Sequence, residues 1–306
     1  MLESVKTQEA SRPDLADMPV NGSLGYIGSQ IYPVMPVQSK AGTYYYRTLE
    51  ADVDADTTRS PGVEASATTL AESSSTFSAA ERIDRQLVPY EMVPLIGGVE
   101  GSDKRGGLLA KRNVMNSIET AQLAAFISGA GSATITSAIV DGIIDALNQV
   151  DRYAGRSAVI MNVGQYRWMI QQTEIKNLLV RSFGGLSPLQ AMSLQPAVFK
   201  AMLQGLFGVD EVLIADDKWW PYAYRLVCAV AKIPATGDEL SFMTDAELGR
   251  TMIYWPTGAT SPYEVNSFPD DNVRGNKYDA IVWDSIEQFN AGAKVLLTIS
   301  TSGSTT

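Results

Sequence analysis

The chain has 306 residues, 45% of them hydrophobic and 19% charged, which is the composition of a folded protein with one large or two ordinary domains. Its net charge of −10 argues against a reader of nucleic-acid sequence, because such proteins place clustered lysine and arginine against phosphate. Histidine is absent, which removes the usual general base and the commonest zinc ligand, so the sequence nominates no catalytic residue, cofactor or metal.

Short motifs supply no alternative chemistry. The paired glycines do not continue into a phosphate-binding loop. Asp52, Asp54 and Asp56 alternate like the start of a calcium loop, but Thr57 and Val63 stand where that loop needs glycine and glutamate. The sequence therefore gives no grounds for a nucleotide or calcium site.

Two features concern the compartment. Met1–Ala10 lacks the basic start and apolar stretch of a signal peptide, and no run of about 18 apolar residues occurs, so we expect a soluble protein with no membrane partner. The single cysteine, Cys228, lies in the apolar run LVCAVA, which predicts a small buried residue without redox chemistry.

The N-terminal part is predicted to be an arm with a connector. Residues 1–25 are polar and contain Pro13 and Pro19, which indicates an extended arm that needs a partner surface to become ordered. Residues 26–37 (YIGSQIYPVMPV) alternate apolar residues with two prolines, a pattern that permits an edge strand or an anchored connector but forbids a central strand.

Residues 41–92 are predicted to form a long β-hairpin. Its strands are Thr43–Leu49 and Phe77–Val88, and the turn lies near Arg59-Ser60-Pro61-Gly62. The middle of this segment has too few apolar residues to build a core, and an isolated hairpin is marginal in water, so we expect support from outside the chain's own core. A surface loop or an active-site lid is the alternative.

Residues 102–128 are predicted to form the longest helix of the chain. Ser102 or Asp103 is expected to cap its start, and Gly129 to end it. Apolar residues recur at helical spacing and predict one core face: Val114, Met115, Ile118, Ala121 and Ala125. Polar residues fall on the opposite face: Arg112, Asn113, Asn116 and Thr120.

Residues 133–258 are predicted to form an α/β region. The first of its helices is expected from the apolar stripe over 139–150, with its end at Gly155. Further helices are expected after the capping box of Asn162 with Gln165, after Ser187-Pro188, and from Pro196 to Gly208. Its strands are expected over 157–161, 209–214, 225–233 and 251–255. An aromatic cluster in this region is interpreted as core or interface: Trp219, Trp220, Tyr222 and Tyr224.

Three long strands are predicted at the C-terminal end, over 263–268, 278–289 and 293–300, and we expect them to return to the first domain. The carboxylate pairs Asp216-Asp217 and Asp270-Asp271 lie beside turns, where capping and solvation explain them. Residues 301–306 form a polar tail without an assignable role.

This order of segments resembles the major capsid proteins of tailed bacteriophages, which have the Hong Kong ninety-seven-like fold. The most specific parts are residues 32–37 (YPVMPV), the strand at 43–47, and residues 59–62 (RSPG) ahead of 90–92 (YEM). The resemblance implies an α+β fold with four parts. These are an N-terminal arm and connector (1–40), an extended β-hairpin loop (41–92), a peripheral domain with a long spine helix (93–132 and 259–306), and an α/β axial domain (133–258).

The implied function is structural. Copies of the chain would form hexamers and pentamers that close into an icosahedral shell around double-stranded DNA, bound without sequence specificity. The implied location is the virion, after assembly in the host bacterial cytoplasm. The implied partners are scaffolding, portal and cement proteins, and any scaffold is expected to be either another chain or a region removed upstream. Loop residues are expected to contact neighbouring subunits: Asp52, Asp54, Asp56, Arg59, Pro61, Gly62 and Glu64.

Two alternatives stay open. An encapsulin-like shell uses a similar fold to enclose protein cargo, and an α/β enzyme could use residues 41–92 as a lid, with a base other than histidine. Some relatives weld neighbouring subunits through a lysine in the extended loop that bonds to an asparagine. No lysine occurs between Ala41 and Asp103, so we expect this chain to hold its neighbours without such a bond.

Overall fold

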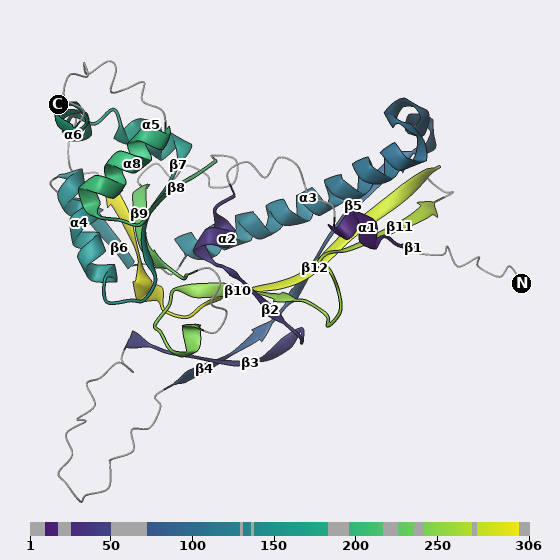
Figure 1. Ribbon diagram of the computed structural model, residues 1–306, viewed down its shortest axis with the longest axis horizontal. Helices are drawn as coiled ribbons and strands as arrows, with labels where there is room; N and C mark the ends of the chain where they lie inside the picture. Colours follow the sequence, from purple (N-terminus) through teal and green to yellow (C-terminus); the bar gives the residue numbers. More distant parts are fainter. Residues whose placement is uncertain are drawn as a thin grey trace, which may run out of the picture.

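The computed structural model describes residues 10–17, 26–49, 72–128, 131–135, 138–182, 196–216, 226–235, 241–270 and 274–299. The molecule is elongated (Figure 1). The long helix α3 (Gly98–Ile127) runs beside the longest described strand, β12 (Gly275–Gln288), while helices α4, α5, α6 and α8 gather at one end.

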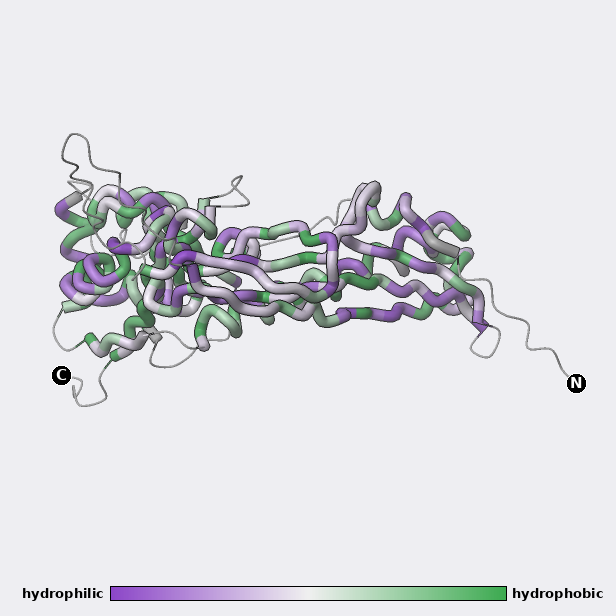
Figure 2. The backbone as a smooth tube through the Cα atoms, turned by 90° about the horizontal axis from the view of Figure 1, so that it is seen from below, coloured by the Kyte–Doolittle hydropathy of each residue, from purple (hydrophilic) through white to green (hydrophobic). Residues whose placement is uncertain are grey.

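A six-stranded sheet lies along α3. Its strands follow the order β1, β11, β12, β10, β2, and β5 pairs with β12 off this path. Figure 2 shows the long strands running side by side along the molecule. The remaining bounds are β1 Ala10–Ser11, β2 Val34–Val37, β5 Ala80–Pro89, β10 Gly249–Tyr254 and β11 Glu264–Asp270.

Strand β2 confirms the predicted edge strand. It pairs in parallel with β10, and Pro36 lies opposite Ile253 at the end of the sheet order, where a residue without an N–H costs no ladder bond. The short helix α2 (Gly28–Ile31) precedes it and buries Ile31 beneath α3.

The N-terminal arm is less extended than expected. Strand β1 pairs with β11, and helix α1 (Pro13–Asp17) buries Leu15 against α3. Gly107 makes the room for it, because a Cβ there would lie 2.7 Å from Leu15 Cδ1. This part of the arm therefore packs on its own chain through the apolar residues of α1. The predominantly polar composition of residues 1–25 did not indicate this packing.

Helix α3 begins at Gly98, earlier than predicted, after Gly97 in the left-handed conformation (φ 93°). The predicted caps Ser102 and Asp103 are wrong, because both lie inside the helix and interact with the Tyr278 hydroxyl at 3.2 and 2.5 Å. The helix ends at Ile127, and the predicted stop, Gly129, lies outside the described residues.

Helix α3 packs against two cores in succession. Ala110, Val114 and Ile118 meet the six-stranded sheet, whereas Leu123 and Phe126 pack against a second sheet and α2. Of the predicted core face, Val114 and Ile118 are buried and Met115, Ala121 and Ala125 are half-buried. Because the helix changes partners, its buried face rotates along its length, and a single stripe could not describe it.

The second sheet has five strands in the order β6, β13, β9, β7, β8. Their bounds are β6 Gly131–Ile135, β7 Arg156–Asn162, β8 Glu211–Ala215, β9 Leu226–Ile233 and β13 Lys294–Ile299. One face packs against the helices α4 Ile139–Val150, α5 Val163–Met169, α6 Thr173–Ser182 and α8 Pro196–Phe207. Cys228 is fully buried there, and burial raises its pKa to about 12.

Local signals in this region gave the right elements. Asn162 Oδ1 accepts a hydrogen bond from the Gln165 N–H at 2.6 Å, and Gln165 Oε1 accepts one from the Asn162 N–H at 2.8 Å, which confirms the capping box. Gly208 follows α8 with a φ of 65°. The helix predicted after Ser187-Pro188 and the aromatics at 219–224 lie outside the described residues.

The sheets cross the predicted domain boundaries. Strand β13 joins the five-stranded sheet instead of returning to the first one, and β10 belongs to the six-stranded sheet instead of the α/β region. Strand β12 pairs with β10 in antiparallel orientation. Strand β13 pairs antiparallel with β9 and parallel with β6. Pairing partners are tertiary information, which strand patterns do not contain.

The hairpin is also assembled differently. Strand β3 (Ala41–Tyr46) pairs with β4 (Ser73–Ser78), whereas β5 leaves the hairpin and pairs with β12. The predicted single strand Phe77–Val88 is therefore two strands that meet at Ala79, whose N–H bonds to the Lys40 carbonyl at 2.7 Å. The loop residues at 52–64 expected to contact neighbours lie outside the described residues.

Candidate subunit-contact surfaces

The base of the hairpin rests on an aromatic cluster of its own chain. Tyr44 and Phe77, from β3 and β4, pack with Phe242 and Phe289, and the Tyr44 and Phe289 rings lie 5.3 Å apart. The Tyr44 hydroxyl donates to Glu287 at 3.0 Å, and burial raises its pKa to about 12. The hairpin thus has internal support at its base, whereas support from outside the chain's own core was expected.

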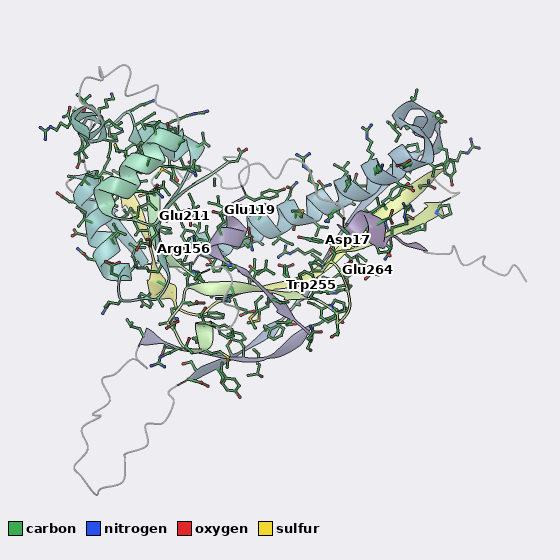
Figure 3. All side chains as sticks on the ribbon, in the orientation of Figure 1. Asp17, Glu119, Arg156, Glu211, Trp255 and Glu264 are labelled. Atoms are coloured by element: carbon green, nitrogen blue, oxygen red, sulfur yellow. The ribbon has the colours of Figure 1, made fainter. Side chains whose placement is uncertain are left out.

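Buried polar groups join the elements that position these surfaces. Glu119 on α3 accepts backbone N–H bonds from Ile27 and Gly28 at 2.8 and 3.0 Å, where α2 crosses α3 (Figure 3). Burial raises the pKa of Glu119, and these two N–H bonds oppose the shift. Because the carboxylate is held at the start of α2, the connector has one fixed position on the long helix.

Lys294, at the start of β13, caps the C-terminal end of α3 with its side chain. Its Nζ donates to the carbonyls of Ala125, Phe126 and Ser128 at 2.9, 2.6 and 2.8 Å. The last carbonyls of a helix lie beyond its backbone N–H donors, and a cation is favoured at this end of the helix dipole. Burial lowers the pKa of Lys294 to about 8. The contact fixes α3 to the five-stranded sheet.

One exposed surface is apolar. It lies at the start of α3 and on the preceding 3-10 turn (Tyr90–Ile96), which buries none of its residues. Leu95 is 82% exposed and Val99 65%, and Met92 is also exposed. Side chains of this size are costly to leave in water, so this end of the molecule is a candidate contact surface.

A second surface is a polar hollow of about 580 Å³ between α3 and β5. Its α3 side carries small or uncharged residues at helical spacing: Asn113, Asn116, Ser117, Thr120, Ala121 and Ala124. Asn116 was placed on the outer face by the sequence, but it is half-buried and accepts a hydrogen bond from the Tyr26 hydroxyl. Asn113 donates to Asp84 of β5 at 3.1 Å.

A third hollow, of about 450 Å³, lies between α1 and the loop after β10. Its lining includes Tyr254, Tyr263, Trp283 and Glu264, the last of which is labelled in Figure 3. Lys40, the residue before the hairpin, places its Nζ 3.5 Å from the centre of the Trp283 ring. This lysine is engaged within its own chain.

Catalytic geometry does not emerge among the described residues. They contain no group of three cysteine, aspartate or glutamate side chains that could hold a metal ion. None of the helices in the described segments is both long and apolar enough to span a membrane. Asp270, from one predicted carboxylate pair, interacts with Lys277 of the neighbouring strand, while Asp217 and Asp271 lie outside the described residues.

No protein-family model and no curated protein matches the sequence. Solved structures do match the fold over almost the whole chain. A phage-related protein from Bordetella bronchiseptica matches with a TM-score of 0.60 and 14% identity, over 95% of this chain and 97% of that one. The bacteriophage PhiM1 mature capsid matches with a TM-score of 0.54 and 10% identity, over 93% and 90%. A virus-like particle from Pyrococcus furiosus matches with a TM-score of 0.53 and 10% identity, over 90% and 92%.

The chain therefore has the α+β fold of phage major capsid proteins, as the sequence predicted.

Proposed function

We propose that the chain is the major subunit of a viral shell. Copies assemble as hexamers and pentamers into an icosahedral capsid that encloses the double-stranded DNA of a tailed phage. The observation that carries the proposal is the end-to-end match to the PhiM1 capsid, in which both chains are covered almost completely. Heterologous contacts between identical subunits generate closed rings and shells, which suits a molecule with several separate exposed surfaces.

The two proposed domains correspond to the two sheets. We assign the six-stranded sheet and α3 to the peripheral domain, and the five-stranded sheet with α4, α5, α6 and α8 to the axial domain. The hairpin then reaches a neighbouring subunit from its aromatic base, with Asp52, Arg59 and Glu64 among the contacting residues. Scaffolding, portal and cement proteins are the further partners that this role requires, and the virion is the final location.

A shell that encloses protein cargo is the second candidate, since a particle described as virus-like, from Pyrococcus furiosus, has a similar fold. The two differ in what the particle contains. Purified particles treated with nuclease would retain protected DNA in a phage capsid and protein cargo in the alternative. We infer no enzymatic activity in either case.

Self-assembly is tested by expressing the full chain, alone and with the proteins of its phage, and examining it by size-exclusion chromatography and negative-stain microscopy. We expect material in the void volume that contains closed shells or rings of capsomers. A stable monomer under all these conditions would overturn the proposal.

A further inference from the structure

Within the described part of the chain, strand β5 is an edge strand of the six-stranded sheet. Among the described residues it pairs with β12 alone, over the ten residues Ala80–Pro89. The Tyr90 N–H donates to the Arg274 carbonyl at 2.9 Å in the same register, so even-numbered residues direct their backbone groups toward β12. Odd-numbered residues, including Glu81, Ile83 and Arg85, direct theirs away from the sheet. Such an edge is a template for another strand.

The charges along this edge are arranged symmetrically. The sequence from Glu81 to Arg85 reads acid, base, isoleucine, acid, base. If a second copy of β5 lies antiparallel with Ile83 opposite Ile83, every charge faces the opposite charge. Glu81 then faces Arg85 of the partner subunit, and Arg82 faces Asp84 of the partner subunit. Opposite charges directly across two strands stabilise a pair, and like charges destabilise it.

The backbone selects the same register. In this alignment odd residues face odd residues, so the outward N–H and C=O groups meet and form about six hydrogen bonds. The two neighbouring alignments that keep this parity place Arg82 opposite Arg82 or Asp84 opposite Asp84. Each introduces like charges at the symmetry axis, so one register is favoured over those beside it.

The side chains also fall on the correct faces. Arg82 and Asp84 point toward α3, since they bond to Ser117 and Asn113 at 3.0 and 3.1 Å. Arg85 points to the other face, where it pairs with Asp279 at 2.6 Å. Ile83 is 52% exposed on that face, so pairing with itself would cover apolar surface.

We infer that two copies of this chain join across a two-fold axis by antiparallel pairing of their β5 strands, centred on Ile83. The inference rests on the proposed shell function for its partner, because it takes a second subunit as the occupant of the edge. It specifies a symmetric contact between neighbouring subunits, in addition to the ring contacts that build capsomers.

Single cysteines test the register. Cys228 is fully buried, so a new surface cysteine is the reactive thiol of the native protein. In Ile83→Cys the two Cα atoms would lie about 5.5 Å apart, within the range of a disulfide. The control is Leu87→Cys, which is on the same face of the strand and 44% exposed. Its two copies would lie about 26 Å apart.

After mild oxidation of assembled particles, we expect a non-reducing gel to show a disulfide dimer for Ile83→Cys and only monomer for Leu87→Cys. Monomer for both variants, or equal dimer for both, would overturn the pairing. Normal particles without the Ile83 cross-link would leave the shell function intact. If no particles form at all, the shell proposal fails, and oxidation of the soluble chain still decides the pairing.

A charge reversal gives a second measurement that needs no cross-link. Glu81→Arg places two arginines opposite each other on both sides of the axis, so we expect a lower particle yield at low salt and recovery as salt screens the repulsion. Asp145→Arg is the control, an exposed acid on α4 that lies on none of the contact surfaces described above. Equal loss in both variants, or normal assembly of Glu81→Arg at low salt, would contradict the pairing.

Discussion

Gly106→Ala should destabilise the chain although it improves the helix propensity of α3. Alanine in a helix interior is favoured over glycine by about 1 kcal/mol. At Gly106, however, a Cβ would lie 2.2 Å from Tyr278 Cδ2 and 2.6 Å from its Cε2. The ring is fully buried, and its hydroxyl is held by Ser102 and Asp103 at 3.2 and 2.5 Å, so it cannot move aside without losing these bonds.

The expected size follows from these opposing effects. Overpacking of a filled core costs about 1–3 kcal/mol, and a lost hydrogen bond about 1 kcal/mol more. After the gain in propensity we expect a net loss of about 1–3 kcal/mol in the free energy of unfolding. Gly205→Ala in α8 is the matched control, because no heavy atom lies within 4 Å of its added Cβ, and it should gain about 0.5–1 kcal/mol.

Urea unfolding of the unassembled chain, followed by circular dichroism, measures both variants. Opposite signs are expected. If Gly106→Ala stabilises the protein as much as Gly205→Ala, the packing of α3 on β12 described above is wrong.

Four further outcomes are expected. Lys294→Met should cost about 1–3 kcal/mol in urea unfolding, because three hydrogen bonds to carbonyls at the end of α3 are lost; an unchanged midpoint would contradict that role. Burial raises the pKa of Glu119 above its ordinary value of 4.5, so its contribution to stability is present below pH 4.5 and is lost as the pH rises through the folded-state pKa. The stability of the wild type relative to Glu119→Gln should therefore fall between pH 4.5 and neutrality, and a flat or rising difference would argue against it. Deleting residues 52–64 should leave the circular dichroism spectrum of a folded chain but abolish particles in sedimentation, whereas normal shells from the deletion would exclude the loop as a contact. Mature particles boiled in detergent and reductant should run as one band near 33.0 kDa, since Lys40 is engaged with Trp283 and no lysine follows before Lys104; a ladder of multiples would reveal a covalent weld.

The sequence predicted elements where the signal is local. Helix α4 begins where its apolar spacing indicated, although it ends at Val150, ahead of the predicted stop at Gly155. The capping box of Asn162 and Gln165 placed the start of α5. Pro196 and Gly208 likewise marked the two ends of α8. Each of these signals lies within a few residues of the structure that it determines, so no tertiary information was needed.

Other features depend on partners far away in the chain. Ser102 has the residue type of a helix cap, but α3 already begins at Gly98. The Ser102 hydroxyl is instead hydrogen-bonded to that of Tyr278, 176 residues later. The break between β4 and β5 at Ala79 arises because the two strands pair with different sheets. No sequence pattern marked Glu119 or Lys294, yet each satisfies buried backbone groups of another element.

The central claim, that this chain builds a closed shell, is tested most directly by cryo-electron microscopy of purified particles. We expect an icosahedral reconstruction in which the wall is made of this chain, arranged in hexamers and pentamers, with α3 and the six-stranded sheet recognisable in each subunit. Particles whose wall consists of another protein, or a chain that forms only open aggregates or monomers, would contradict the account.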